Sequence, residues 1–242
     1  MSESAAFFDI DGTISREGLI CEMFHKMIQY ELIDSSKWED EVEPAYRRWD
    51  RREGDYDTYL KKMVDIYSDT VVGVNRVHIE YIAKRVVEQK GQRVYTYTRD
   101  KMKWHREQGH KVIAISGSPY ELVSHMCAQY KMDDCRGTIY NVDKDGLYTG
   151  EIIPMWNSVS KRAAIDELCQ KYDLDLAKCY AYGDTTGDFS MFKLVGHSTA
   201  INPTRELLDK ILSDDELRRR IEIIVERKDT TYRLDPATID LV

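Results

Sequence analysis

The chain has 242 residues, of which 42% are hydrophobic and 32% are charged. It is long enough to bury a sizeable core, and its composition is that of a soluble globular protein rather than a disordered one. The formal net charge of -8 and the pI near 5.4 argue against a general nucleic-acid or anionic-membrane surface, because phosphate groups are bound by clustered Lys and Arg. A small anionic substrate remains compatible with this charge, since one local positive site can hold it.

Cysteine usage indicates a reducing compartment. The thiols are odd in number, scattered and free of any C-x-x-C pair, which predicts reduced core residues rather than a disulfide or zinc framework: Cys21, Cys127, Cys135, Cys169 and Cys179. The N-terminus shows no basic region followed by an apolar signal core, and no apolar stretch approaches the ~20 residues of a membrane helix. We therefore expect a cytoplasmic protein that is neither secreted nor membrane-spanning.

The first predicted strand ends in acidic residues. An apolar run starting at Ala5 leads into Asp9 and Asp11, followed by Gly12 and Thr13. Asp is depleted from strand interiors and Gly interrupts them, so the strand should stop at Asp9. Ligands bind outside the carboxyl ends of strands in open α/β sheets, which makes this end a candidate active site. The alternative is a capped turn, in which both carboxylates bond nearby backbone amides.

A helical block should follow, from residue 17 to about residue 90. Apolar residues recur there at helical spacing in some four segments with no convincing strand between them. This predicts a helical cap domain of residues 16–91 inserted into a core domain of residues 1–15 and 92–242. Trp38 and Trp49 are expected in the core of the cap. The run Arg47, Arg48, Arg51 and Arg52 is typical of a solvated face, although it could sit over an anionic substrate.

Beyond residue 91, strands and helices alternate. A helix containing Met102 and Trp104 should end at Gly109. The remaining predicted elements are a strand 110–116, a helix 121–130, a hairpin 137–153, a helix 161–172 capped by Ser158 or Ser160, a strand 178–182, a helix 188–194, a strand 198–201, a helix 205–212 and a strand 221–225. This alternation predicts an α/β fold with a Rossmann-like, doubly wound, mostly parallel sheet and helices on both faces.

Polar groups gather at the ends of these predicted strands and the starts of the helices. Ser116 and Gly117 follow one strand, and their turn can present backbone N–H groups to an anion. Lys161 opens a helix. Asp184 and Asp188 follow another strand, and their spacing of four residues is that of two side chains on one helical face. Each feature alone is typical of an ordinary turn, but their repetition at successive strand ends indicates a site.

These residues resemble the four motifs of the haloacid dehalogenase (HAD) superfamily. The segments DIDGT, Ser116 after an apolar strand, Lys161 and GDTTGDFSMF occur in the superfamily's order. The helical insert resembles its small helical cap. The last motif and the hairpin DKDGLYTGEI are similar to phosphoserine phosphatases, the type IB subfamily. The resemblance implies a HAD-like Rossmann core with an inserted helical cap.

The resemblance also implies catalytic roles for two acids. Asp9 would be the nucleophile that attacks phosphorus and forms an aspartyl-phosphate. Asp11 would protonate the leaving alcohol and then activate water. The cofactor would be Mg²⁺, held by Asp9, the backbone carbonyl of Asp11 and Asp184. Asp188 would orient the metal's waters or ligands as an outer-shell residue.

The remaining motif residues would bind the phosphoryl group. Ser116, the Gly117 amide and Lys161 would hold its oxygens, where charge must be stabilised during transfer. The last motif departs from the family in having Gly187 where Asn is common. Phosphoserine phosphatases grip the amino acid with a cap acid and an arginine. Glu17 falls one residue from the expected acid, and Lys61 and Lys62 lie where we would expect the arginine, which a lysine does not replace equally.

The sequence thus predicts a Mg²⁺-dependent phosphomonoester hydrolase acting on a small soluble phosphorylated metabolite, with phosphoserine as one candidate. Two alternatives stay open. A phosphotransferase would give the phosphoryl group to a second alcohol, and a non-catalytic protein would keep the fold to bind a phosphate ligand. The sequence names neither the substrate nor the oligomeric state.

Overall fold

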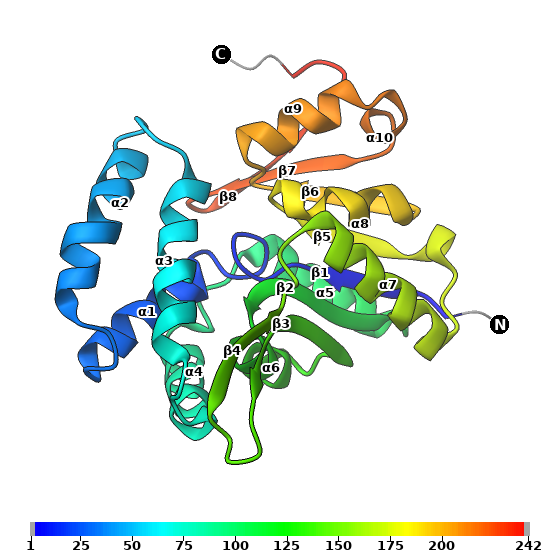
Figure 1. The fold of residues 1–242 in the computed structure, drawn as a ribbon. Helices are drawn as coiled ribbons and strands as arrows, with labels where there is room; N and C mark the ends of the chain where they lie inside the picture. The colour runs from blue at the N-terminus through cyan, green and yellow to red at the C-terminus, as the bar shows by residue number, and fades with distance from the viewer. Residues whose placement is uncertain (1–2, 240–242) are drawn as a thin grey trace.

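The computed structural model describes residues 3–239 and places an eight-stranded sheet at the centre of the chain (Figure 1). The strand order is β4-β3-β2-β1-β5-β6-β7-β8, with β4 and β8 antiparallel to their neighbours and the other strands parallel. The strands are β1 (Ala5–Phe8), β2 (Lys111–Pro119), β3 (Asp134–Val142), β4 (Tyr148–Ile153), β5 (Tyr180–Gly183), β6 (His197–Ile201), β7 (Glu222–Arg227) and β8 (Thr230–Leu234). The predicted α/β, mostly parallel sheet is confirmed.

Helices account for most of the remaining chain. The first block comprises α1 (Leu19–Gln29), the π-helix η1 (Lys37–Val42), α2 (Glu43–Asp50), α3 (Tyr56–Val71) and α4 (Arg76–Lys90). The others are α5 (Thr96–Glu107), α6 (Tyr120–Tyr130), α7 (Ser158–Tyr172), α8 (Phe189–Leu194), α9 (Arg205–Ser213) and α10 (Asp215–Arg218), with short 3₁₀ turns η2 (Leu176–Lys178) and η3 (Thr186–Asp188). No helix in residues 3–239 is both long and apolar enough to cross a membrane.

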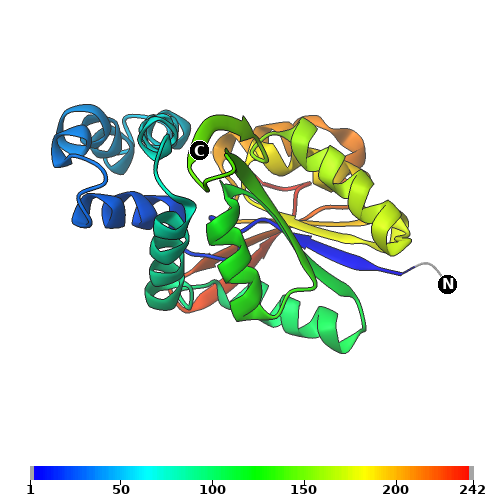
Figure 2. The ribbon, with the colours of Figure 1, turned by 60° about the horizontal axis from the view of Figure 1, so that its bottom comes forward.

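Helices cover both faces of the sheet, and successive side chains along each strand point alternately toward one face and the other. In β1, Ala5 and Phe7 pack with residues of α7, α8 and α9, whereas Ala6 and Phe8 pack with residues of α5 and α6 on the opposite face. Figure 2 shows the strands lying between the yellow-to-orange helices and the green ones. Short apolar strands are therefore buried on both sides, as expected for a parallel sheet.

The block α1–α4 lies to one side of the sheet in both views (Figures 1 and 2). Its apolar side chains, among them Met23, Phe24 and Tyr67, continue into the cluster that covers the Ala6–Phe8 face. Helix α4 contacts α6 of the core as well as α1. Asp55 and Asn75 cap α3 and α4 by accepting backbone N–H groups, as these residue types commonly do.

Two expectations about the elements are wrong, and one strand lies where none is predicted. Helix α7 begins at residue 158 with Asn157 as its N-cap, so neither Ser158 nor Ser160 is the cap and Lys161 lies one turn inside the helix. Strand β8 is absent from the sequence prediction. The segment 184–188 is not one helical face, because η3 is a 3₁₀ turn that separates β5 from α8.

Candidate active site

Three adjacent strands deliver polar residues to one edge of the sheet. β1 lies between β2 and β5 in parallel register, so residues following these strands emerge side by side. Asp9 follows β1 and its backbone N–H donates to Tyr182 of β5 at 3.0 Å. Asp184 directly follows β5, and Ser116 lies within β2. The structure thus brings together residues more than 60 positions apart in sequence.

Lys161 reaches this edge from α7 and contacts two acids. Its Nζ lies 2.6 Å from Asp9 Oδ1 and 2.5 Å from Asp188 Oδ1. All three residues are buried, with Lys161 only 2% exposed. The other oxygen of Asp188 accepts the backbone N–H groups of Asp184 (3.0 Å) and Thr185 (3.1 Å). Asp188 therefore fixes both the ammonium group and the loop that carries Asp184.

Asp184 is held from the first loop. Thr13 donates its hydroxyl to Asp184 Oδ1 at 3.0 Å. Gly12 has φ of +81°, and a Cβ built there would lie 2.0 Å from Asp184 Oδ2. A side chain at position 12 is therefore excluded both by backbone conformation and by the carboxylate beside it.

Burial and mutual repulsion dominate the electrostatics of these acids. Burial, reinforced by the charges of Asp188 and Asp11 and opposed by Lys161, raises the pKa of Asp9 to about 8. Burial, followed by the charge of Asp9, likewise raises the pKa of Asp184 well above its usual value. Burial alone would lower the pKa of Lys161, but the two carboxylates it contacts outweigh burial and raise it. The cluster carries more negative charge than its lysine neutralises.

This excess charge fits a divalent cation. Asp9, Asp184 and Asp188 each offer a carboxylate oxygen, and these oxygens lie within 4.8 Å of one another. Three carboxylates against one ammonium leave a formal charge of -2, and Mg²⁺ prefers oxygen ligands of this kind. Both oxygens of Asp188 already accept hydrogen bonds. Asp9 and Asp184 are accordingly the better placed side chains to hold the ion, with Asp188 supporting them.

Asp11 lies apart from this cluster, facing the start of the helical block. Its Oδ1 accepts the backbone N–H of Leu19 at 2.6 Å, and its Oδ2 accepts the hydroxyl of Ser118 at 2.5 Å. Burial raises the pKa of Asp11, although these two hydrogen bonds oppose the shift. Ser118 is absent from the sequence-based site. Its position two residues after Ser116 is the signal that could have indicated it. The expected turn at Ser-Gly-Ser-Pro is wrong, because these residues form the end of β2.

The two glycines of the site share one neighbour. A Cβ on Gly117 would lie 2.9 Å from the Trp156 Cβ, and a Cβ on Gly187 would lie 2.6 Å from the Trp156 carbonyl oxygen. The loop between β4 and α7 therefore packs against both motifs. This contact explains why Gly occupies position 187, where the family commonly has Asn. Ser116 is buried, and its Oγ accepts the Ser118 N–H at 3.2 Å.

The residues expected to recognise an amino acid are engaged elsewhere. Glu17 pairs with Arg93 at 2.9 Å, and Lys61 pairs with Asp65 at 2.6 Å on an exposed face of α3. Lys62 is also exposed. Among the contacts of residues 3–239, none joins these three side chains to Asp9, Asp11 or Asp184. Their role in substrate binding stays a prediction.

Two other side chains of the helical block lie next to Gly18, close to the start of α1. The Tyr56 hydroxyl and the Cys21 Sγ would each lie 3.1 Å from a Cβ on Gly18, the residue before Leu19. Burial raises the pKa of Tyr56, and the charges of Cys21, Asp11 and Asp184 add to the effect. The Tyr56 hydroxyl thus lies beside Gly18, next to the residue whose N–H donates to Asp11. Sequence reasoning missed it, because aromatic residues at helical spacing are typical of a core.

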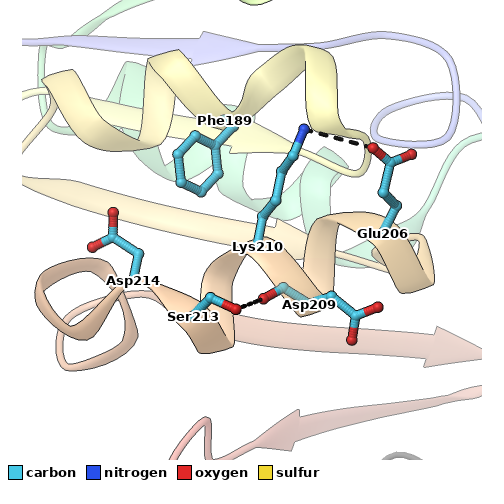
Figure 3. A pocket seen from close by; sticks show the side chains of 6 residues that line it. All are labelled: Phe189, Glu206, Asp209, Lys210, Ser213 and Asp214. Carbon is cyan, nitrogen blue, oxygen red and sulfur yellow. Dashed lines mark hydrogen bonds and ion pairs between the residues drawn. The ribbon is translucent and has the colours of Figure 1, made fainter.

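Two surface hollows lie on other elements. One of about 450 Å³ runs along α8 and α9 (Figure 3) and is lined by Phe189, Glu206, Asp209, Lys210, Ser213 and Asp214. The other, of about 370 Å³, includes three of the four arginines of the run 47–52 and is lined by Glu39, Glu43, Pro44, Arg47, Arg48 and Arg51. Neither lining includes a residue of the acid cluster.

Comparison with known proteins agrees with this geometry. The sequence profile of the haloacid dehalogenase-like hydrolases matches residues 6–193. The chain belongs to this family. It is 30% identical over 153 residues to the putative hydrolase ML2424 of Mycobacterium leprae, covering 58% of this chain and 51% of that protein. It is also 30% identical over 116 residues to phosphoserine phosphatase SerB1 of Mycobacterium tuberculosis, covering 48% and 37%.

The chain thus spans about half the length or less of these two relatives. Among solved structures, a Bordetella pertussis protein of unknown function shares the fold with a TM-score of 0.71 at 15% identity, over 91% of this chain and 98% of that one. A substrate-bound phosphoserine phosphatase has a TM-score of 0.59 at 19% identity, over 87% and 91%. These likenesses establish the HAD-like fold.

Proposed function

We propose that the protein is a Mg²⁺-dependent phosphomonoester hydrolase that acts on a small phosphorylated metabolite through an aspartyl-phosphate. The observation that carries this proposal is the arrangement around Asp9. Lys161 holds one of its oxygens at 2.6 Å, and Asp184 lies beside it. A carboxylate fixed in this way at a strand end is a positioned nucleophile next to a cationic group.

The chain's own residues account for both chemical steps. In the first, an Asp9 oxygen forms a bond to phosphorus while the bond from phosphorus to the alcohol oxygen breaks, and Asp11 gives its proton to that oxygen. In the second, Asp11 takes a proton from water as the water oxygen attacks phosphorus and releases the Asp9 carboxylate. The raised pKa of Asp11 suits a group that must hold a proton before the first step.

The phosphoryl oxygens would be held by Ser116, the Gly117 amide and Lys161. When bound by Asp9, Asp184 and the Asp11 carbonyl, Mg²⁺ supplies positive charge to the phosphoryl group. We further propose that residues 16–91 form a cap over a core of residues 1–15 and 92–242, closing to exclude bulk water. A cytoplasmic location belongs to the same proposal, since the five cysteines are free.

Hydrolysis of p-nitrophenyl phosphate tests this proposal. Purified protein should release phosphate with Mg²⁺ and lose that activity in EDTA, and Asp9→Asn should abolish it. The exposed Asp209, in the hollow of Figure 3, provides the matched control, because Asp209→Asn removes a carboxylate of the same type outside the acid cluster. Equal turnover by wild type and Asp9→Asn would exclude the proposed nucleophile.

A substrate panel then separates the candidates. Phosphoserine is one of them because relatives and structural neighbours include proteins named phosphoserine phosphatase, although Glu17 and Lys61 pair elsewhere. Phosphorylated amino acids, sugars and nucleotides should be compared. A phosphate ester formed on an added alcohol would indicate a phosphotransferase instead. Thermal stabilisation by these compounds without turnover would indicate a non-catalytic binder.

A further inference from the structure

Glu226 is a buried acid outside the cluster just described. It lies in β7, beyond the region matched by the family profile, and its side chain is 3% exposed. Glu226 Oε1 accepts the backbone N–H of Thr96 and a guanidinium N–H of Arg16, each at 3.0 Å, and its Oε2 accepts the N–H of Tyr97 at 2.8 Å. Both oxygens of this carboxylate are therefore engaged by donors.

These donors come from two stretches that flank the helical block: one leads into α1, and the other leads from α4 into α5. We call residues 13–17 and 93–97 the connector pair. Ser15 and Val94 form an antiparallel bridge. Arg16 N–H donates to the Arg93 carbonyl at 2.9 Å, and Tyr95 N–H donates to the Ile14 carbonyl at 2.9 Å. The two connectors thus bond to each other, and Glu226 holds both from the side of the sheet.

Glu226 also supplies a helix cap that the local sequence lacks. Thr96 and Tyr97 are the first residues of α5, whose N-cap residue Tyr95 makes no side-chain capping bond. A carboxylate at a helix N-terminus satisfies free N–H groups and interacts favourably with the helix dipole. The β7–β8 hairpin projects toward the side of the molecule where α1–α4 lie (Figures 1 and 2). On that side, Glu226 fixes the start of α5.

The first connector is continuous with the loop that carries Asp11. Asp11 forms a bridge with Ser15, and Gly12 N–H donates to the Ser15 carbonyl at 3.0 Å. At the far end, Leu19 N–H donates to the Asp11 carboxylate. The placement of the connector therefore determines where the Asp11 carboxylate lies.

We propose that Glu226 is a positioning residue for the reaction: by clamping the connector pair through Arg16, Thr96 and Tyr97, it sets the place of the Asp11 carboxylate relative to Asp9. The inference rests on the proposed function in that Asp11 serves as the general acid. It predicts a catalytic effect of a residue that lies outside the acid cluster and outside the profile-matched region.

Glu226→Gln tests the inference, because glutamine keeps the shape but offers one acceptor oxygen and turns an NH₂ group toward an N–H donor. Turnover of phenyl phosphate and p-nitrophenyl phosphate should be compared. Phenol is the more basic leaving group and depends more on protonation by Asp11. We compare kcat/KM, which reports only the step that forms the aspartyl-phosphate and releases the alcohol, because the later hydrolysis of this intermediate is common to both esters. We expect kcat/KM on phenyl phosphate to fall about tenfold, part of the 10²–10⁴-fold that a general acid contributes, and kcat/KM on p-nitrophenyl phosphate to fall much less. Equal falls, or none, would overturn the inference.

Two further variants exclude a purely structural effect. Asp134→Asn alters a carboxylate in β3 that accepts the N–H of Cys135 and an Arg136 guanidinium, both at 2.8 Å, and it should leave the ratio of the two rates unchanged. Arg16→Met, at a side chain that is 42% exposed, provides a second route if Glu226→Gln does not fold. It should shift the ratio in the same direction as Glu226→Gln, and Arg16→Lys should restore part of it.

Hydrogen exchange separates failure of this inference from failure of the proposed function. The Leu19 amide, which donates to Asp11, should exchange faster in Glu226→Gln than in wild type and Asp134→Asn, whether or not the protein turns over either ester. Unchanged exchange at Leu19 would overturn the clamp. Absence of hydrolysis by wild type, together with faster exchange in the variant, would reject the hydrolase and retain the clamp.

Discussion

Replacing Lys161 by methionine removes a buried positive charge while keeping most of the apolar stem. In the native chain the ammonium lies 2.6 Å from Asp9 and 2.5 Å from Asp188. The substitution leaves these acids and Asp184 buried together without their lysine. Since Met and Lys are similar in length, the change tests charge rather than packing.

The expected loss of unfolding free energy is large because both ion pairs of Lys161 are buried. Removing one partner of a buried ion pair costs about 3–5 kcal/mol of unfolding free energy, since the remaining charge stays uncompensated. In a chain of this size, each kcal/mol shifts the melting temperature by about 2–4 °C, so the midpoint should fall by roughly 6–20 °C. Protonation of Asp9 on folding limits the loss, because a neutral carboxyl no longer needs the partner.

Denaturant unfolding of Mg²⁺-free protein at pH 7.5 measures this loss, with Lys171→Met as the matched control. Lys171 lies on the same helix α7 and pairs with Asp134 at 2.8 Å, but its side chain is 52% exposed. Exposed pairs add little stability, so the control should unfold close to wild type. Equal denaturant midpoints for Lys161→Met and Lys171→Met would refute the argument that burial makes the Lys161 contacts strong.

Three further predictions concern backbone, acid and histidine. Gly12→Ala should lower the free energy of unfolding by more than the about 1–2 kcal/mol of a left-handed alanine, and it should weaken Mg²⁺ binding in calorimetry. The control Gly73→Ala, with φ of +77° and open space around it, should show the backbone cost alone. Equal losses of unfolding free energy in the two variants would contradict the clash with Asp184. The pKa of Asp9 is raised to about 8, so the folded state binds a proton that the unfolded state releases. The free energy of unfolding of the Mg²⁺-free protein should therefore fall as pH rises from about 4 to 8. Denaturant titrations of Asp9→Asn should show a weaker dependence of this free energy on pH. Burial, followed by the charges of His110 and Lys101, lowers the pKa of His105 to about 3, so the unfolded state binds more protons than the folded state. The free energy of unfolding should therefore fall as pH drops below about 6.5. If it falls equally steeply with pH in His105→Phe, His105 is not the cause.

The sequence predicts the residues of the candidate site that a local pattern marks, and the structure brings these residues together. Asp9 ends an apolar run, and Asp184 follows another, so each is visible from its own neighbours. The predicted relation between Asp184 and Asp188 is wrong, because a spacing of four residues does not by itself make a helix. In the structure Thr185 and Asp188 form a capping box around a 3₁₀ turn, and such a side-chain bond competes with helical geometry.

Contacts between distant segments could not be predicted in this way. Ser118 meets Asp11 across 107 positions, and Glu226 meets Tyr97 across 129. Neither contact leaves a periodic signal in the chain. Strand β8 was missed for a related reason: as an edge strand, it has largely exposed side chains and no apolar alternation, which is typical of edges that avoid further pairing.

The strand order explains why polar and charged side chains gather around Asp9. From β1 the chain reaches β2 on one side, whereas β5, β6 and β7 lie on the other. The order of strands therefore reverses at β1, and such a switch point leaves a crevice at the carboxyl edge of the sheet. Each neighbour contributes a different group there: hydroxyls from the end of β2, a carboxylate after β5 and an ammonium from α7.

The helical block departs from this same edge, immediately after Asp11. The bond from Leu19 N–H to Asp11 joins the first residue of α1 to the proposed general acid. Any displacement of α1 therefore changes the position or the hydrogen bonding of that acid. A helical block inserted at this point can couple its own placement to the proposed proton transfer, and the proposed clamp by Glu226 limits that placement from β7.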